Sequence, residues 1–311
     1  MIEIVSYAKS ISKKKNILSN FNLLLKVFKF MKLVRFGKKN NEKPGLIDPE
    51  GGIRDLSDYF SDFTHEGVSL ETLDKIKNID YNKLSKIPRT TRLGSCLADT
   101  PNFYCIGLNY VKHAKETNAE IPKEPIVFSK STSSITGPND QVIIPKGSVK
   151  TDWEVELGVI IGENCQYVSE KDALSVVSGY CIVNDVSERS YQFDRGGQWI
   201  KGKSAPTFAP IGPFIVTADE IEDPQNLNME LSVNGITVQK SNTSDMIFKV
   251  TEIISHLSNF MALRQGDIIA TGTPEGVGVG MKPPMFLKEG DVMELEIDFL
   301  GSQKQTVVAY K

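Results

Sequence analysis

Acidic and apolar residues alternate in the middle of the chain, over residues 152–162. Read as a β-strand, this segment places Asp152, Glu154 and Glu156 on one face and apolar side chains on the other. The run continues into three apolar residues at 159–161, which indicates burial. A buried carboxylate cluster is unfavourable unless it takes up protons, pairs with basic groups or binds a cation. The segment therefore predicts a divalent-cation site; the alternative is a half-exposed strand with a solvated acidic face.

The composition is that of an ordinary globular protein. The 311 residues predict one large domain with a smaller one, and 40% hydrophobic and 24% charged residues are typical of a soluble chain. A net charge of -3 gives no reason to expect nucleic acid or an anionic membrane as a partner. The four cysteines form no closely spaced pair, so we expect reduced thiols, no zinc site and a cytoplasmic location.

Three segments are expected along the chain. Residues 1–30 are rich in lysine and contain no apolar run long enough to span a bilayer, so we expect a disordered N-terminal extension. Residues 31–98 begin with an alternating strand, pass a Pro-Glu-Gly-Gly turn at 49–52 and suggest short helices between 68 and 87. They predict a small α+β domain. Residues 99–311 carry the remaining candidate site residues and form the expected catalytic domain.

A histidine and a glutamate follow a strand and a tight turn early in that second part. The strand is expected at residues 102–107, and Asn109 can cap the helix that follows. His113 and Glu116 are spaced i, i+3 and share one helical face. A carboxylate beside an imidazole raises its basicity and sets its tautomer, as a general base requires. The alternative is an ordinary surface pair.

A further carboxylate ends a short apolar strand at residues 179–183, which follows a helix expected at 169–178. Asp185 projects from this strand end and is a candidate third ligand. Carboxylate oxygens favour Mg²⁺ or Mn²⁺ over zinc. Arg189 and Gln192 follow four and seven residues later, on the same side of a helical turn. They suit an anionic substrate, because Arg matches a carboxylate with two hydrogen bonds; the alternative for both is a solvated helix face.

Two later segments carry weaker signals. Lys203 lies in a loop rich in glycine and proline and could neutralise a developing enolate, although a loop lysine is more often exposed. The glycine-rich turn at 271–278 follows an apolar strand and can offer backbone N–H groups to a ligand, but it lacks the lysine of a phosphate-binding loop.

A second acidic strand competes with the first. Glu294, Glu296 and Asp298 also alternate with apolar residues, so spacing alone does not separate the two strands. The later strand lies between glycine turns near the chain end and reads as a half-exposed strand, so we assign it a structural role.

Taken in order, six motifs resemble the fumarylacetoacetate hydrolase (FAH) family. They are Ile106-Gly107-Leu108-Asn109-Tyr110 with His113 and Glu116, Asp152-Trp153-Glu154-Val155-Glu156, Asn184-Asp185-Val186-Ser187-Glu188-Arg189, Lys201-Gly202-Lys203-Ser204, Pro210-Ile211-Gly212-Pro213 and Thr271-Gly272-Thr273-Pro274. The text from residue 31 to 57 is similar to the small N-terminal domain of many members. The resemblance implies an α+β, mainly β fold, with a mixed β-sandwich or β-roll catalytic domain that is usually dimeric.

The resemblance also implies roles for individual residues. One Mg²⁺ or Mn²⁺ would be held by Glu154, Glu156 and Asp185, which leaves Asp152 outside the ligand set. The proton-transfer pair would be His113 and Glu116, and the substrate contacts would be Arg189, Gln192, Lys203 and Thr273. One departure concerns substrate placement: Ala205 and Pro206 stand where many relatives carry an Asp.

The implied function is metal-dependent hydrolysis of a C–C bond in a 2,4-dioxo acid, such as a diketo-deoxy sugar acid or an acylpyruvate, to release a 2-oxo acid. Lys203 would act on the leaving enolate, and a homodimer with a small-molecule substrate is expected. Alternatives on the same site are a ureidoglycolate lyase, an oxaloacetate decarboxylase or tautomerase, and an unsaturated-dioate isomerase. An alternative of another class is a non-catalytic relative that binds a metal or metabolite.

Overall fold

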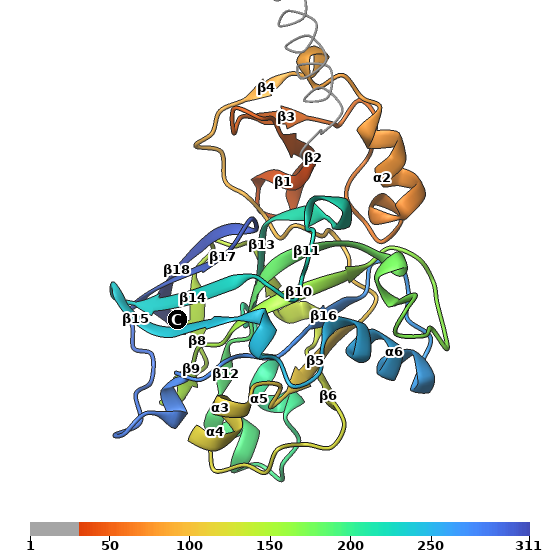
Figure 1. The fold of residues 1–311 in the computed structure, drawn as a ribbon. Coiled ribbons are helices and arrows are strands. Elements are labelled where there is room, and N and C mark those ends of the chain that lie inside the picture. Colours follow the sequence, from red (N-terminus) through yellow and green to blue (C-terminus); the bar gives the residue numbers. More distant parts are fainter. Residues whose placement is uncertain (1–30) are drawn as a thin grey trace, which may run out of the picture.

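A mixed sheet of 11 strands runs through the part of the chain that the computed structural model describes, residues 31–311 (Figure 1). The extension predicted for residues 1–30 lies outside the described residues. The strand order is β4-β3-β2-β1-β13-β11-β10-β16-β5-β6, with β7 paired to β13. The strands are β1 (Lys32–Lys38), β2 (Asn41–Ile47), β3 (Ile53–Asp55), β4 (Lys86–Ile87), β5 (Phe103–Gly107), β6 (Ile126–Ser129), β7 (Ile135–Thr136), β10 (Val155–Ile161), β11 (Val177–Asn184), β13 (Ala209–Thr217) and β16 (Ile268–Ala270).

Strands β1 to β4 and helix α2 (Leu70–Lys77) lie together at the top of Figure 1, and we refer to this part of the structure as the N-terminal lobe. Its first strand joins the rest of the sheet, because Lys32 and Leu33 of β1 pair with Val216 and Ile215 of β13. The expected strand and turn are present, and the helical stretch contains α2 with the short 3-10 helices η1 (Glu66–Val68) and η2 (Tyr81–Lys83). Helix α2 begins after Ser69, whose hydroxyl accepts the N–H of Thr72.

A second sheet of five strands packs on one face of the first. Its order is β15-β14-β17-β18-β8, from β8 (Val142–Ile144), β14 (Asn228–Val233), β15 (Ile236–Asn242), β17 (Val292–Ile297) and β18 (Gly301–Ala309). Leu157 of β10, Leu231 of β14 and Leu295 of β17 share one hydrophobic core, which makes the arrangement a sandwich. The predicted α+β, mainly β fold is confirmed.

Helices are few and short. Helix α6 (Val250–Phe260) buries Ile253, Ile254 and Leu257. The helix expected at 169–178 is wrong: the structure has η4 (Ala173–Val176) followed by β11. Strand β11 pairs with both β10 and β13, and this pairing favours an extended chain from the β-branched Val177 onward. None of the described helices is long and apolar enough to cross a membrane.

Short elements gather at one end of the central sheet, at the bottom of Figure 1. They are α3 (Val111–Glu116), α4 (Arg189–Phe193), α5 (Ile200–Lys203), β9 (Thr151–Asp152) and β12 (Ser187–Glu188). They lie where β5, β10 and β11 begin or end, and they carry most of the predicted site residues. The remaining short 3-10 turns are η3 (Thr132–Ser134), η5 (Ala218–Glu220), η6 (Thr243–Asp245) and η7 (Gly278–Gly280).

Candidate active site

The acidic segment at residues 152–162 is buried on both faces. The expected single strand is divided into β9, which ends at Asp152, and β10, which starts at Val155. Every residue of β10 is buried, and Glu154 and Glu156 are only 4% and 1% exposed. The alternative of a solvated acidic face is therefore wrong for this strand.

Strand pairing brings the three predicted ligands together. Val155 of β10 is in register with Asn184 of β11, so Asp185 lies just beyond the strand end. The backbone N–H of Asp185 donates to the carbonyl of Glu154 over 2.9 Å. As a result Glu154, Glu156 and Asp185 each offer a carboxylate oxygen within 4.8 Å of the others.

These carboxylates are unequally compensated. Burial, with the charges of Asp185 and Glu154, raises the pKa of Glu156 well above its usual value. Burial opposes ionisation of Glu154 as well, but the nearby Lys203 and Arg189 lower the pKa of Glu154 to about 2. Among the described residues Glu156 forms no ion pair; it accepts the N–H of Gly272 over 2.8 Å, and Lys203 offsets only part of the effect of burial. The cluster therefore requires a proton or a cation, and its all-oxygen donor set fits Mg²⁺ or Mn²⁺.

Lys203 lies inside the cluster. It ends the short helix α5 and is 2% exposed, so the expectation of an exposed loop lysine is wrong. Its Nζ lies 2.7 Å from Glu154 Oε2 and 2.7 Å from Asp185 Oδ2. Burial would lower the pKa of Lys203, but Asp185 and Glu154 outweigh it and raise the pKa. The ammonium therefore remains charged between Glu154 and Asp185.

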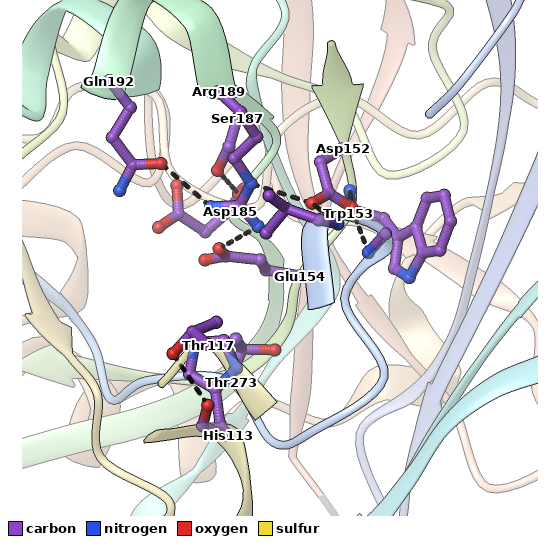
Figure 2. A network of polar contacts seen from close by, with 12 residues as sticks. His113, Thr117, Asp152, Trp153, Glu154, Asp185, Ser187, Arg189, Gln192 and Thr273 are labelled. Carbon is purple, nitrogen blue, oxygen red and sulfur yellow. Dashed lines mark hydrogen bonds and ion pairs between the residues drawn. The ribbon is translucent and has the colours of Figure 1, made fainter. Parts of the chain in front are cut away.

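The guanidinium of Arg189 is held by hydrogen bonds at two of its three nitrogen atoms. Its Nε donates to Asp152 Oδ2 over 2.8 Å and its Nη1 to Gln192 Oε1 over 3.0 Å; Figure 2 shows the three side chains in a row above Glu154. The Nη2 atom lies 2.7 Å from Glu154 Oε1 but makes no hydrogen bond there. It is one of three buried polar side-chain atoms without a hydrogen-bond partner among the described residues.

Asp152 acts behind this arginine. It is fully buried and, besides Arg189, accepts the backbone N–H groups of Gly278 and Val279 over 2.7 and 2.9 Å. The side chain thus fixes both the guanidinium and the glycine-rich loop.

His113 and Glu116 form the expected pair on α3. Nδ1 of His113 lies 2.8 Å from Glu116 Oε1, and Glu116 Oε2 accepts the N–H of Gly276 over 2.9 Å. His113 is buried, so the alternative of a surface pair is wrong. It lies on the opposite side of Glu154 from the arginine row (Figure 2).

Asn109 does not cap α3 as expected, because the N-cap is Tyr110. Its amide instead donates to the carbonyl of Thr271 over 2.7 Å and accepts the N–H of Phe248 over 2.7 Å. Asn109 therefore holds the start of the loop that carries Thr273. The hydroxyl of Thr273 donates to the carbonyl of Val155 and accepts from Gln239.

A cavity of about 170 Å³ joins these groups. The predicted residues that line it are His113, Glu154, Glu156, Arg189, Gln192, Lys203 and Thr273. Asp185 and Glu116 do not line the cavity, but each contacts a residue that does: Asp185 contacts Lys203, and Glu116 contacts His113. The structure therefore brings together all nine residues that the sequence singled out.

Two parts of the site escaped the sequence analysis. Phe128 and Trp199 form an edge-to-face pair, 5.3 Å between ring centroids, that lines the cavity beside Lys203. Trp199 is one of two tryptophans, a rarity that could have drawn attention to it. Lys130 forms a buried ion pair with Asp185 Oδ1. No spacing distinguishes Lys130 from the many other lysines of the chain.

The competing acidic strand is an ordinary one. Glu294 and Glu296 of β17 point outward and are exposed, while Met293, Leu295 and Ile297 are buried. Glu294 pairs with the exposed Lys304 on β18 over 2.7 Å. As predicted, β17 is half-exposed.

The chain matches known proteins over most of its length. The family model described as fumarylacetoacetate (FAA) hydrolase C-terminal matches residues 102–308. A protein of Burkholderia ambifaria, with a general hydrolase name that states no substrate, is 52% identical over 277 residues, 89% of this chain and 98% of that protein.

Solved structures are similar as well. A fumarylacetoacetate hydrolase from Exiguobacterium antarcticum aligns with a TM-score of 0.81 and 34% identity, covering 90% of this chain and 100% of that one. A maleylpyruvate hydrolase from a Sphingobium species, solved with manganese(II) and pyruvate, aligns with a TM-score of 0.75 and 28% identity at the same coverage. A 5-carboxymethyl-2-hydroxymuconate delta-isomerase from Mycobacterium smegmatis aligns with a TM-score of 0.71 and 28% identity, covering 90% of this chain and 100% of that one.

Fold and relatives together define an enzyme of the class that acts on ketonic compounds. The chain belongs to the fumarylacetoacetate hydrolase family.

Proposed function

We propose that this protein is a metal-dependent hydrolase that cleaves a C–C bond in a 2,4-dioxo acid and releases a 2-oxo acid. The observation that carries the proposal is one cavity that joins a carboxylate cluster, the Arg189 guanidinium and the His113–Glu116 pair. Such a cavity can bind an acid, stabilise negative charge on it and move a proton beside it.

Glu154, Glu156 and Asp185 would hold one divalent cation, Mg²⁺ or Mn²⁺. When bound, the cation supplies Lewis-acid polarisation of the substrate's oxygen atoms and stabilises the charge that develops on them. The similar maleylpyruvate hydrolase, solved with manganese(II) and pyruvate, supports this assignment.

Arg189 would orient the substrate carboxylate. Its Nε and Nη1 donate to Asp152 and Gln192, whereas its Nη2 faces Glu154 Oε1 at 2.7 Å and has no hydrogen-bond partner among the described residues. A guanidinium fixed at two corners loses little further freedom when it binds an anion. Gln192 and Thr273 line the same cavity and complete the polar contacts.

His113 would accept a proton from a water molecule that attacks the 4-carbonyl carbon. Glu116 holds Nδ1, which leaves Nε2 as the base. The C–C bond then breaks with its electron pair on the leaving fragment, where Lys203 would balance the negative charge. That fragment takes up a proton, so that water and the dioxo acid yield a carboxylic acid and a 2-oxo acid.

Other reactions need the same groups. A decarboxylase or tautomerase of oxaloacetate and an isomerase of unsaturated dioates stabilise an enolate-like charge, and the similar delta-isomerase is one such isomerase by name. A lyase acting on ureidoglycolate would instead remove the proton of the substrate hydroxyl as the C–N bond breaks. The homodimer, the cytoplasmic location and the domain boundary between residues 98 and 99 also stay predictions.

The test is turnover of a panel that contains acylpyruvates, diketo-deoxy acids, oxaloacetate and ureidoglycolate, with Mg²⁺ or Mn²⁺ and with EDTA. We expect a 2,4-dioxo acid to be cleaved only with the cation, and His113→Ala to lower kcat by about 10²–10⁴-fold. His256→Ala is the matched control, because His256 lies on α6 against Phe260, outside the cavity lining. Turnover of no panel member would contradict the proposal and favour a non-catalytic binding protein.

A further inference from the structure

A buried lysine, which the reaction proposed above leaves unused, stands directly behind the carboxylate cluster. The side chains of Lys130 and its partner Asp185 are both 0% exposed, and Lys130 does not line the cavity. We propose that Lys130 is a positioning residue that reserves one oxygen of Asp185, so that Asp185 meets the cation through a single oxygen and the site selects a small six-coordinate ion. The inference rests on the cation site of the proposed function.

Both the backbone and the side chain of Lys130 are held in place beside Asp185. It follows β6 directly, and its backbone N–H donates to the carbonyl of Phe103 over 3.0 Å. Its Nζ contacts Asp185 Oδ1 and the carbonyl of Val186, the latter at 3.2 Å. An ammonium held between a carboxylate and a buried carbonyl has no path to solvent, so this oxygen of Asp185 is permanently engaged.

Both glutamates are restricted in the same way. Glu156 Oε2 accepts the N–H of Gly272, and Glu154 Oε1 faces Nη2 of Arg189 at 2.7 Å. The carboxylate oxygens not engaged by Lys130, Gly272 or Arg189 are Asp185 Oδ2, Glu154 Oε2 and Glu156 Oε1. The first two of these contact Lys203 at 2.7 Å, and Lys203, unlike Lys130, lines the cavity, so we expect a cation to approach the cluster from the Lys203 side.

The number of available oxygens determines which ion is favoured. Ca²⁺ takes six to eight oxygens and readily accepts both oxygens of one carboxylate, whereas Mg²⁺ requires an octahedral shell. Three single oxygens leave room for substrate oxygens around an octahedral ion and underfill the shell of Ca²⁺. Removal of the Lys130 ammonium frees Asp185 Oδ1 and makes a two-oxygen contact available.

The test compares the wild type with Lys130→Met, which keeps the length and apolar stem of the side chain. The Kd values of Mn²⁺ and Ca²⁺ are measured by calorimetry on the substrate-free full-length protein. We expect the preference for Mn²⁺ over Ca²⁺ to fall by about tenfold. Lys304→Met, which breaks an exposed pair with Glu294, is the control and should leave the ratio unchanged.

If Lys130 has only a structural role, Lys130→Met should weaken the binding of Mn²⁺ and Ca²⁺ by the same factor. An unchanged ratio of the two Kd values in Lys130→Met therefore overturns the proposal. If that variant does not fold, the wild type provides the test, because water molecules on bound Mn²⁺ can be counted by ¹⁷O-water ENDOR. Three single-oxygen ligands leave about three waters on an octahedral ion. A lower count overturns the proposal. A wild type that binds neither ion contradicts the cation site of the proposed function itself.

Discussion

Two clusters of charged residues in this protein contain similar groups and differ in how they are neutralised. The junction cluster, formed by Arg35, Glu42, Asp62, Arg92 and Asp140, joins the N-terminal lobe to the rest of the chain. Arg35 binds both oxygens of Asp62 over 2.7 and 2.8 Å, and Arg92 binds both oxygens of Asp140 over 2.8 and 2.6 Å. Glu42 accepts a further bond from Arg92 over 2.8 Å.

The cation cluster leaves one carboxylate without such a partner. The pKa of Asp140 is lowered, because Arg92 and Thr136 outweigh the opposing effect of burial. The pKa of Glu156 is raised, because burial and two like charges outweigh the charge of Lys203 and the N–H of Gly272. In the junction cluster each arginine binds both oxygens of one carboxylate through two hydrogen bonds. In the cation cluster each lysine acts as a point charge that contacts single carboxylate oxygens and leaves others free. The first arrangement suits a structural joint, and the second suits a site that binds a cation.

The largest expected effect separates the cation cluster from the rest of the surface. Glu156→Ala should weaken Mn²⁺ binding by at least about 100-fold, because it removes one of three charged ligands from a buried site. Calorimetric titration with Mn²⁺ measures the change. Glu296→Ala, on the exposed face of β17, is the matched control and should bind as the wild type does. The reverse result would move the site to the C-terminal strand.

A moderate effect is expected in the junction cluster. Arg92→Met should lower the free energy of unfolding by about 2 kcal/mol, because it leaves the largely buried Asp140 without its arginine and Glu42 with only the longer contact to Arg35 at 3.6 Å. Urea denaturation measures the loss, and the Kd of Mn²⁺ should not change. Lys304→Met breaks an exposed pair and should stay within about 0.5 kcal/mol of the wild type. A loss of Mn²⁺ binding in Arg92→Met would show that the two clusters are coupled.

The smallest effect is a dependence of stability on pH with opposite signs in the two clusters. The pKa of Asp140 is lower in the folded protein than its usual value of 3.8, so ionised Asp140 stabilises the fold above pH 3.8. As the pH falls, the unfolded chain takes up the proton first, and this stabilisation is lost as the pH passes through the lowered pKa. The raised pKa of Glu156 acts oppositely: without a cation, stability falls as pH rises from 4.5 through the raised pKa. Asp140→Asn should remove the first dependence and Glu156→Gln the second, in urea denaturation at several pH values. Identical slopes in the variants and the wild type would contradict both assignments.

Local patterns identified the components of the site but not their surroundings. The i, i+3 spacing placed His113 beside Glu116, and strand alternation placed Glu154 beside Glu156, because both relationships depend only on nearby backbone geometry. The same alternation recurs at Glu294 and Glu296, on a strand with one face in solvent. Periodicity is identical in the two strands, so only the second packed layer decides which acids are buried.

The sequence by itself determined the fold class, the family and the residue types available for chemistry, since six ordered motifs are specific together. The tertiary structure alone decided that Lys203 reaches between two carboxylates, that Asp152 holds Arg189, and that Lys130 occupies one oxygen of Asp185. Lysine and arginine side chains are long and flexible, and their charged ends meet partners far away in sequence. Their contacts therefore depend on how distant strands pair, which no local spacing records.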